Sequence, residues 1–394
     1  MNRKGMTRRR MIQATLAAGM ALSTGRIASA SVKTTQVDAS GYFTIDKRGG
    51  RWWFITPEGE PFFSIGMNHI DPASLRFVEN GHIWREKYGN SMRRWLTESV
   101  APNLKSWGFN SIGWTQEVIT RGPTNHRHSR HFTYDEYQWA GLPYCHQLPF
   151  GDFHQWESET RNPDFFSEEF AEWCDHVARE HCVPLSKDPK LIGYFYIDCP
   201  TWVHIRKHNV WKGPLFDPDK LETKAGRAEL RNLATQWYKV THDAIRRYDP
   251  HHLILGDRYE ANAALPIEVV EAAAPYVDVL SFQDFRDPVA HLAEWYRQTG
   301  KPVLWADGAH TIKTTSPDGE TCLHTDGKWW GEALAGLRQN PGCIGAHICG
   351  AYIRNRSRRR GLLDPFENPD TPNVKLITDA NRQMESWVKR MTSE

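Results

Sequence analysis

Eight short apolar runs, separated by stretches of helical periodicity, constrain the fold of this chain more than any other feature. Each run has the length of a buried strand and is followed by polar residues. The runs are Phe62–Asn68, Phe109–Trp114, Tyr144–Leu148, Leu191–Ile197, His252–Gly256, Val277–Phe282, Pro302–Trp305 and Cys343–Ile348. Strands that alternate with helices predict a parallel α/β barrel. An open doubly wound sheet is the alternative, but no Gly-rich phosphate turn follows the first run.

Helical patterns lie between these runs, and a hairpin pattern precedes them. The helical patterns cover Glu168–Arg179, Ala225–Arg247, Pro288–Gly300 and Lys328–Asn340. Before the first run, alternating apolar residues flank Gly49-Gly50 and then Gly59, as in two successive hairpins. We therefore expect the α/β class, with a single (β/α)8 TIM barrel in residues 31–394 and an N-terminal β-hairpin extension.

Residues 1–30 predict an export signal. Thr7-Arg8-Arg9 precedes an apolar run from Met11 to Leu22, and the small residues 28–30 follow. This order is typical of a twin-arginine signal peptide. The apolar run is too short to span a bilayer comfortably, so we expect cleavage rather than a membrane anchor. The prediction is a periplasmic or secreted protein with no membrane partner after cleavage.

The charge of the mature chain argues against a nucleic-acid partner. The whole sequence carries a formal charge of +2, and residues 1–30 hold six Lys or Arg and no acid, so the remainder carries −4. The basic run is Arg354–Arg360, which is by default a solvated loop but could also meet an acidic or sulfated sugar. The aromatic content, with 17 Trp, mildly favours a carbohydrate ligand because sugar rings stack on flat apolar faces. The sequence predicts no oligomeric state.

Polar side chains follow nearly every predicted strand at its carboxyl end, where barrel enzymes carry their chemistry. These ends carry Asp198 and Asp307, and they carry Asn68, His69, Trp114, Trp202, Glu260, Asp284, Trp305, His310 and His347 as candidate substrate-binding residues. The histidines could orient a carboxylate or simply make structural hydrogen bonds, and the tryptophans could stack on sugar or pack in the core. The rim histidines lack a paired ligand spacing and no Cys-x-x-Cys pair occurs, so we expect no metal and no cofactor.

Five stretches carry a family resemblance: GRWWFITPEGEPFFSIGMNHI, GFNSIGW, LIGYFYIDCPTW, KPVLWADGAH, and CIGAHICGAYI with the later GLLDPFENP. They resemble the β-agarase and β-galactosidase-like families of retaining glycoside hydrolases. The resemblance runs from about Gly41 to Pro369, nearly the whole mature chain. It implies a TIM barrel with catalytic glutamates on the fourth and seventh strands. It also implies a poly- or oligosaccharide substrate, such as a β-galactan or an agarose-like polymer.

The catalytic motifs depart from the family pattern. In those families the fourth strand typically reads Gly-Tyr-Phe-x-Asp-Asn-Glu-x-x-Trp. Aligned without gaps from Gly193 to Trp202, the Asn position is Asp198 and the acid/base Glu position is Cys199. The nucleophile Glu of the seventh strand falls on Asp307. Both glutamates are replaced, yet a carboxylate remains at or next to each position.

One hypothesis is a working hydrolase that uses Asp198 as acid and Asp307 as nucleophile or base. Replacing Glu by the shorter Asp on both sides increases the distance between the two carboxyls by very roughly 2 Å in total. Retaining sites hold them about 5–5.5 Å apart and inverting sites about 6.5–9.5 Å apart. Such a pair could leave room for a water, so inversion is a hypothesis for this site.

A second hypothesis moves the acid to Glu260 or Asp284. Arg258 could hold either of these ionised, although a loop salt bridge is the simpler role for both and for Glu260 is preferred to catalysis. A third hypothesis is a barrel that binds carbohydrate without cutting it. Cys199 is a poor general acid because a free thiol has a pKa near 8.5, and it is more simply interpreted as a small residue that fills the space left by Glu.

Overall fold

The computed structural model describes residues 40–76, 78, 80–121, 127–151, 163–203, 214–215, 217–261, 265–315, 319, 321–354 and 360–392. The predicted signal peptide, residues 1–30, lies outside the described residues, as do residues 355–359 of the basic run. Asp38–Glu394 forms one compact unit. Among the helices that can be described, none is long and apolar enough to cross a membrane.

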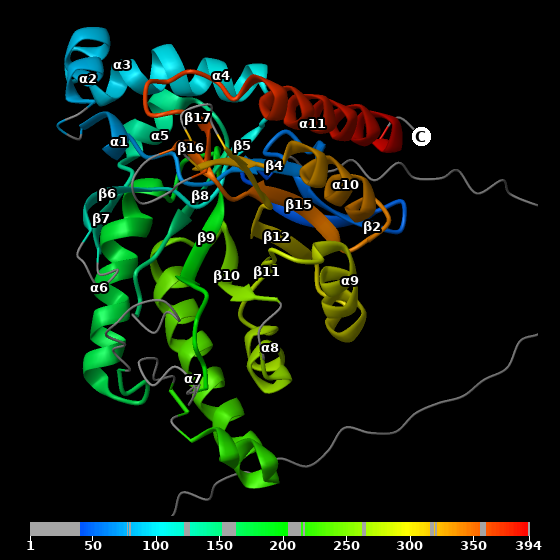
Figure 1. Ribbon diagram of the computed structural model, residues 1–394. Helices are drawn as coiled ribbons and strands as arrows, with labels where there is room; N and C mark the ends of the chain where they lie inside the picture. Colours follow the sequence, from blue (N-terminus) through cyan, green and yellow to red (C-terminus); the bar gives the residue numbers. More distant parts are fainter. Residues whose placement is uncertain are drawn as a thin grey trace, which may run out of the picture. The chain divides into compact units, whose positions relative to one another are not determined.

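Eight parallel strands close into a barrel, as the apolar runs predict (Figure 1). In chain order they are β4 (Ser64–Met67), β5 (Ser111–Ile112), β8 (Tyr144–Gln147), β9 (Leu191–Asp198), β10 (Leu253–Glu260), β11 (Leu280–Gln283), β12 (Val303–Gly308) and β15 (Cys343–Ile348). Each strand pairs with the next one in this series, and β15 pairs with β4 to complete the ring. The TIM-barrel prediction is confirmed. Every strand overlaps its predicted run, although β10 and β12 extend beyond their predicted ends at Gly256 and Trp305.

Helices surround this barrel (Figure 1). They are α1 (Ala73–Arg76), α2 (Gly81–Tyr88), α3 (Met92–Trp95), a π-helical turn (Leu96–Val100), α4 (Ala101–Ser106), α5 (Tyr134–Ala140), α6 (Glu168–Leu185), a 3-10 turn (Pro218–Glu222), α7 (Lys224–Tyr248), α8 (Ile267–Ala273), α9 (Pro288–Thr299), α10 (Gly327–Leu337) and α11 (Thr371–Thr392). The four predicted helices correspond to α6, α7, α9 and α10. The Asp287 side chain caps α9 by accepting a hydrogen bond from the amide of Ala290.

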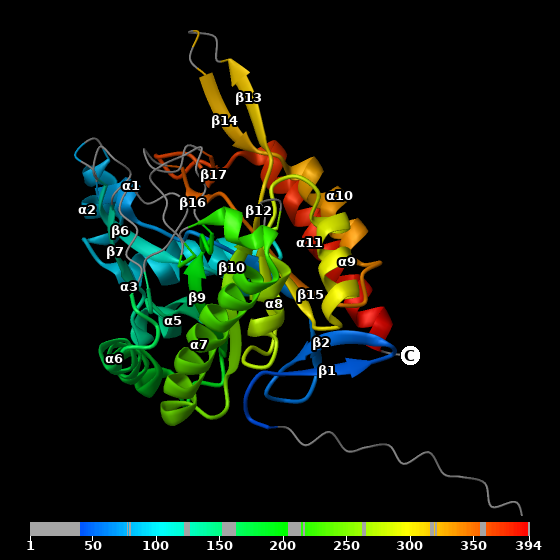
Figure 2. The same cartoon turned by 90° about the horizontal axis from the view of Figure 1, so that it is seen from below.

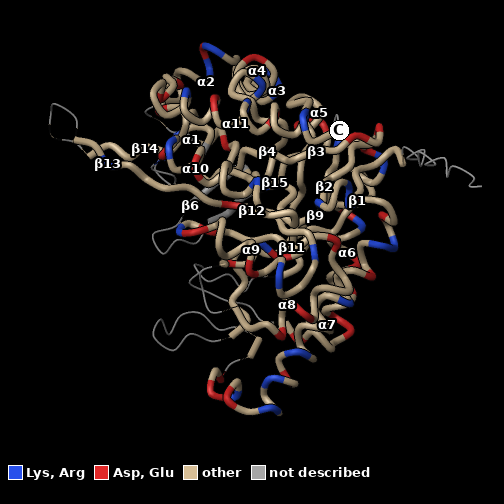
Figure 3. The backbone as a smooth tube through the Cα atoms, turned by 90° about the vertical axis from the view of Figure 1, so that its right-hand side faces the viewer, with Lys and Arg blue, Asp and Glu red and all other residues tan. Residues whose placement is uncertain are grey.

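Antiparallel strands extend the barrel. At the N-terminal side, β1 (Thr44–Arg48), β2 (Arg51–Ile55) and β3 (Pro61–Phe62) form one sheet. Gly49 and Gly50 both have positive φ, as a tight two-residue hairpin turn requires. Two further pairs are antiparallel, β6 (Gln116–Arg121) with β7 (Arg127–His131) and β13 (Thr311–Thr315) with β14 (Thr321–Thr325). In contrast, β16 (Ala351–Ile353) and β17 (Gly361–Leu363) pair in parallel. The β13–β14 hairpin projects away from the barrel (Figures 2 and 3).

The core has two parts, one inside the barrel and one between the barrel and its helices. The interior cluster includes Phe195, Leu255, Leu304 and Ile344, each at most 1% exposed. The outer surface of the helices carries charges of both signs, as α7 shows (Figure 3). These charges include exposed ion pairs such as Lys220–Glu229, which contribute little to stability.

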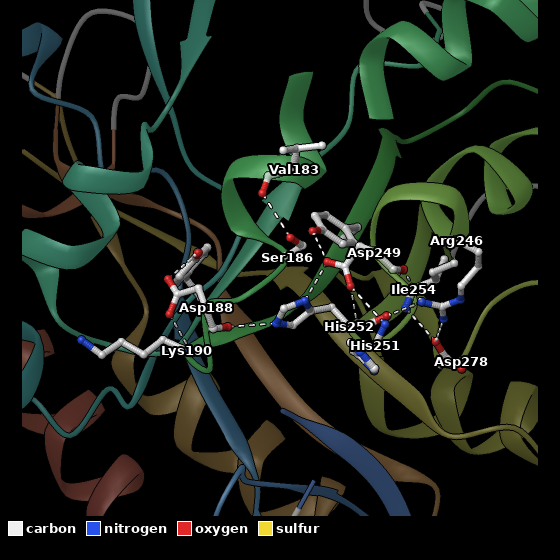
Figure 4. A network of polar contacts seen from close by, with 12 residues as sticks. Val183, Ser186, Asp188, Lys190, Arg246, Asp249, His251, His252, Ile254 and Asp278 are labelled. Atoms are coloured by element: carbon white, nitrogen blue, oxygen red, sulfur yellow. Dashed lines mark hydrogen bonds and ion pairs between the residues drawn. The ribbon is translucent and has the colours of Figure 1, made fainter. Parts of the chain in front are cut away.

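A buried polar network fixes the N-terminal ends of the strands (Figure 4). The Asp249 carboxylate binds His252 Nδ1 at 2.7 Å and accepts a hydrogen bond from the Tyr194 hydroxyl at 2.6 Å. Burial would raise the pKa of Asp249, but its hydrogen bonds with His252 and Tyr194 hold it below its usual value. A network at this end of a barrel serves stability, because chemistry in this fold occurs at the opposite rim.

Candidate active site

Arg258, at the end of β10, points into the mouth of the barrel because the strand is irregular. Leu255 faces the interior, and regular alternation would place Asp257 there as well. The register shifts on both sides of Gly256, whose φ is +65°, and this reverses the alternation. Asp257 instead accepts a hydrogen bond from Tyr238 on α7. The bulge therefore turns a guanidinium into the centre of the site.

The Arg258 guanidinium joins the two predicted catalytic carboxylates. Its Nη1 lies 3.0 Å from Asp198 Oδ1, and its Nη2 lies 3.0 Å from Asp307 Oδ2. The three side chains are 0%, 5% and 5% exposed, so this is a buried ionic cluster. The centre of the Trp114 ring lies 4.5 Å from the guanidinium carbon. A cation placed between two carboxyl groups offsets the repulsion that two negative charges would have at short range.

Asp307 is held as an anion by three neighbours. Asn68 Nδ2 donates to Asp307 Oδ1 at 2.7 Å, and His69 Nε2 lies 3.6 Å from Asp307 Oδ2. Burial would raise the pKa of Asp307, but Arg258, His69 and Asn68 together lower it well below its usual value. The Asn68 amide is itself oriented, since its Oδ1 accepts the backbone N–H of Trp114 at 2.7 Å. An ionised carboxylate in a fixed position suits a nucleophile or an anion that stabilises positive charge.

His69 has a strained backbone. Its φ of +55° lies in the left-handed region, which a residue with a Cβ enters at a cost of order 1–3 kcal/mol. Its N–H donates to the carbonyl of Trp114 at 2.8 Å, and its carbonyl accepts from the amide of Tyr352 at 3.2 Å. The surrounding structure thus fixes the imidazole beside Asp307.

Asp198 and Cys199 end β9 on the other side of the guanidinium. Asp198 Oδ1 also accepts a hydrogen bond from the side-chain amide of Gln283. The Cys199 amide donates to the carbonyl of Arg258 at 2.9 Å, and its Sγ lies 3.7 Å from Glu260 Oε2. Burial, followed by the nearby Asp198 and Glu260 charges, raises the pKa of the Cys199 thiol. A neutral, 1% exposed thiol fills space, as the simpler interpretation expects, and is no thiolate nucleophile.

Three tryptophans are predicted candidates for sugar stacking, and the structure buries all of them. Trp114, 2% exposed, lies against Arg258. Trp202 packs on Trp237 and Tyr238, and Trp305 stacks on the Trp330 ring with 5.1 Å between centroids. For Trp202 and Trp305 the structure therefore shows the alternative of core packing, because neither ring has a face open to a ligand.

Asp284 and His310 belong to the loops that support the site. The Asp284 carboxylate is fully buried, accepts the N–H of Asp287 at 3.0 Å and binds His291 Nδ1 at 2.5 Å. These contacts fix the start of α9, and this accounts for Asp284 without a catalytic role. The His310 ring stacks on Trp329 at 4.0 Å between centroids. It is partly exposed and remains accessible to a ligand.

His347 and Glu260 occupy different depths. His347 is 0% exposed, and its Nε2 is 2.8 Å from Ser64 Oγ. Burial, then the Arg258 charge, lowers the pKa of His347 to about 3, so the ring is neutral. It is fully buried beside Ser64 and is not placed to meet a substrate. Glu260, the last residue of β10, is only half-buried, and its Oε2 lies beside Cys199 Sγ.

His69, Asp307 and Cys349 could together offer three ligand atoms to a metal, because one such atom from each lies within 4.8 Å of the others. However, Arg258 Nη2 is 3.0 Å from Asp307 Oδ2, and Arg360 Nη2 is 3.5 Å from Cys349 Sγ. Two guanidinium groups directly on two of the three ligands oppose a cation at that point. The residues therefore do not fit a metal ion.

Sequence reasoning missed the partners of the carboxylates. It placed Arg258 beside Glu260 or Asp284, whereas the structure places it between Asp198 and Asp307; the bulge at Gly256 is the reason. A signal was present, since an arginine within a strand that is otherwise buried requires a buried acid. Gln283, on β11, gave no comparable signal.

No protein-family model and no curated protein sequence matches this chain. Among solved structures, it is similar to an exo-β-agarase, with a TM-score of 0.68 and 16% identity over 91% of this chain and 66% of that one. It is similar to the agarase AgWH50C, with a TM-score of 0.64 and 18% identity over 88% and 64% of the two chains. It is also similar to BpGH50, with a TM-score of 0.64 and 16% identity over 91% of this chain and 85% of that one.

A GH2 β-galacturonidase from Eisenbergiella tayi is a more distant match, with a TM-score of 0.52 and 14% identity over 86% and 54% of the chains. The chain spans about two thirds of the length of the agarase AgWH50C and of the exo-β-agarase. At these identities the likeness concerns the fold. The described chain is a TIM barrel of the kind found in glycoside hydrolases.

Proposed function

We propose that this protein is an exported glycoside hydrolase that cleaves O-glycosidic bonds of a poly- or oligosaccharide, with a β-galactan or agarose-like polymer as the first candidate. One observation carries the proposal. The ends of β9 and β12 each deliver a buried carboxylate to the C-terminal mouth of the barrel, where one guanidinium orients both. These are the two strands on which the resembling families carry their catalytic acids.

Asp307 is proposed as the nucleophile or the water-activating base. Its ionised state supports either role, although a strongly lowered pKa makes it a weak base and favours electrostatic stabilisation or nucleophilic attack. In the inverting form of the reaction, Asp307 would take a proton from water as the oxygen attacks the anomeric carbon. The acid would protonate the glycosidic oxygen as the leaving sugar departs as an alcohol.

Asp198 is proposed as that acid, and Glu260 is the alternative. Asp198 Oδ1 accepts a hydrogen bond from Gln283 and lies beside Arg258. Glu260 is half-buried, whereas Asp198 is 4% exposed, and this difference favours Glu260 if the buried Asp198 serves only to hold Arg258.

A second function is a barrel that binds carbohydrate without cleaving it. Arg258 favours this candidate, because its ion pairs with both aspartates are already complete without substrate. In that case the cluster is a structural replacement for the two missing glutamates.

The test is a panel of marine and plant oligosaccharides, incubated with the mature protein and followed by mass spectrometry and anomer-resolved NMR. The variants are Asp307→Asn, Asp198→Asn and Glu260→Gln, with the exposed Asp379→Asn as a matched control. Cleavage by the parent and the control, and none by Asp307→Asn, supports the hydrolase. If Glu260→Gln loses cleavage and Asp198→Asn retains it, the catalytic acid is Glu260. Binding without cleavage by every protein supports the non-catalytic barrel, and the first anomer decides between inversion and retention.

Export is part of the proposal and has its own test. The support is the twin-arginine pattern of the sequence. Replacing Arg8 and Arg9 with Lys should retain the protein in the cytoplasm while the parent reaches the periplasm or the medium. Equal export of both proteins would contradict a twin-arginine route.

A further inference from the structure

A second arginine lies at the rim of the barrel and differs from Arg258 in its charge balance. Arg360 directly precedes β17, and its Nη1 donates to Thr311 Oγ1 at 2.6 Å. Its Nη2 is 3.5 Å from Cys349 Sγ, and its guanidinium carbon lies 5.8 Å from the centre of the Phe285 ring. Contacts from three separate segments of the chain thus hold this side chain in one direction.

No carboxylate in the described part of the chain pairs with Arg360. Its contacts there are a hydroxyl, a thiol and an aromatic ring. Arg258, in contrast, faces two aspartates. A half-buried guanidinium with only neutral neighbours carries an uncompensated positive charge, and a fixed guanidinium fork binds carboxylate or sulfate oxygens in pairs.

The position of Arg360 relates it to the proposed catalytic centre. Cys349 Sγ lies 3.5 Å from Arg360 Nη2 and within 4.8 Å of an Asp307 carboxylate oxygen. The guanidinium and that carboxylate are therefore at most about 8 Å apart. This is on the order of the width of one sugar ring with its substituents. A group attached to the ring that contacts Asp307 could reach Arg360.

We propose that Arg360 binds the anionic group of an acidic sugar, a uronate carboxylate or a sulfate ester, in the sugar unit next to Asp307. The inference rests on the proposed function for its sugar ligand, but it concerns binding rather than cleavage. It changes the expected substrate from a neutral galactan to a charged polysaccharide. Thr311 and Phe285 are positioning residues that hold the guanidinium.

The test measures binding by calorimetry with the full chain in the Asp307→Asn background, so that no probe is consumed. The probes are a galacturonate oligosaccharide, its methyl ester, a sulfated galactose oligosaccharide and its neutral counterpart. Four proteins are compared: Asp307→Asn alone, and the same protein with Arg360→Gln, Arg360→Lys or Arg382→Gln added. Arg382→Gln is the control for removing an exposed arginine, since Arg382 lies on α11. Circular dichroism and thermal melting check that each variant is folded.

We expect one of the two acidic probes to bind at least about tenfold more tightly than its neutral counterpart, because a hydrogen bond between charged groups is stronger than one between neutral groups. That preference should disappear in Arg360→Gln, weaken in Arg360→Lys and persist in Arg382→Gln. Which acidic probe is preferred distinguishes carboxylate from sulfate.

The proposal is overturned if neutral and acidic probes bind alike, if neither acidic probe binds, or if Arg360→Gln weakens both members of a pair equally. Its failure is separable from that of the hydrolase. An acid preference that depends on Arg360, in a protein that cleaves nothing, would support this inference and reject the hydrolase. Cleavage of neutral galactan by a protein that does not prefer acidic sugars would support the hydrolase and reject the inference about Arg360.

Discussion

Replacing Arg258 with Met tests the central feature of the site, the shared guanidinium. The substitution keeps much of the apolar volume and removes the charge. It leaves Asp198 and Asp307, each 5% exposed in its side chain, without their buried cation. Breaking a buried pair typically costs about 3–5 kcal/mol. Because one cation serves both acids, the two losses overlap, and we expect a total of about that size at pH 8.

The loss should depend on pH, and the sign follows from the carboxylates. In the parent the pKa of Asp307 lies below its unfolded value, so its contribution is present above that unfolded value and declines in more acidic solution. In the variant, burial without the Arg258 charge should raise the pKa of Asp307 above its unfolded value. The Asp307 carboxylate then destabilises the protein at high pH, and the defect shrinks as the pH falls to 5.

The assay is urea unfolding at pH 8 and pH 5, followed by tryptophan fluorescence. Arg231→Met is the matched control, because it removes an arginine from an ion pair with Glu271 in which both side chains are 47% exposed, and it should cost less than about 1 kcal/mol at both pH values. Adding Asp307→Asn to Arg258→Met should restore part of the stability at pH 8. An equal loss at the two pH values, or no rescue, would refute the view that Arg258 neutralises buried charge.

Three further predictions follow from the same contacts. Cys199→Ser should retain any hydrolytic activity, since the buried thiol is neutral, and complete loss with an intact fold would restore a chemical role to the sulfur. Gly113→Ala should destabilise the protein by about 1–3 kcal/mol in urea unfolding, because its Cβ would overlap Asn68 Oδ1; a stability equal to the parent's would contradict the packing. Burial, with His181 nearby, lowers the pKa of His131 to about 3, so between pH 6.5 and 3 the unfolded chain binds more protons than the folded one. The free energy of unfolding should therefore decrease by up to about 1.4 kcal/mol for each unit that the pH falls in this range. His131→Asn should flatten this pH dependence, and an unchanged slope would contradict the prediction.

The sequence determined the fold because its signals are local. Each barrel strand is an apolar run that no other secondary structure would bury as well, and eight of them with intervening helices leave few topologies. Gly49-Gly50 fixed the first hairpin in the same way, because two consecutive positive φ values require glycine-like residues. Asp287 before Pro288 marked the start of α9 for an equally local reason, its capping hydrogen bond.

The site was predicted only in part because its contacts are not local. Asp198 and Asp307 could be proposed from their places at two strand ends, but their common partner could not. Regular alternation directs Arg258 outward and Asp257 inward, and only the bulge at Gly256 exchanges them. Arg360 depends likewise on loops that meet after the barrel has closed. The sequence by itself determined which strands form and where they end, whereas tertiary structure decided which side chains face one another at that rim.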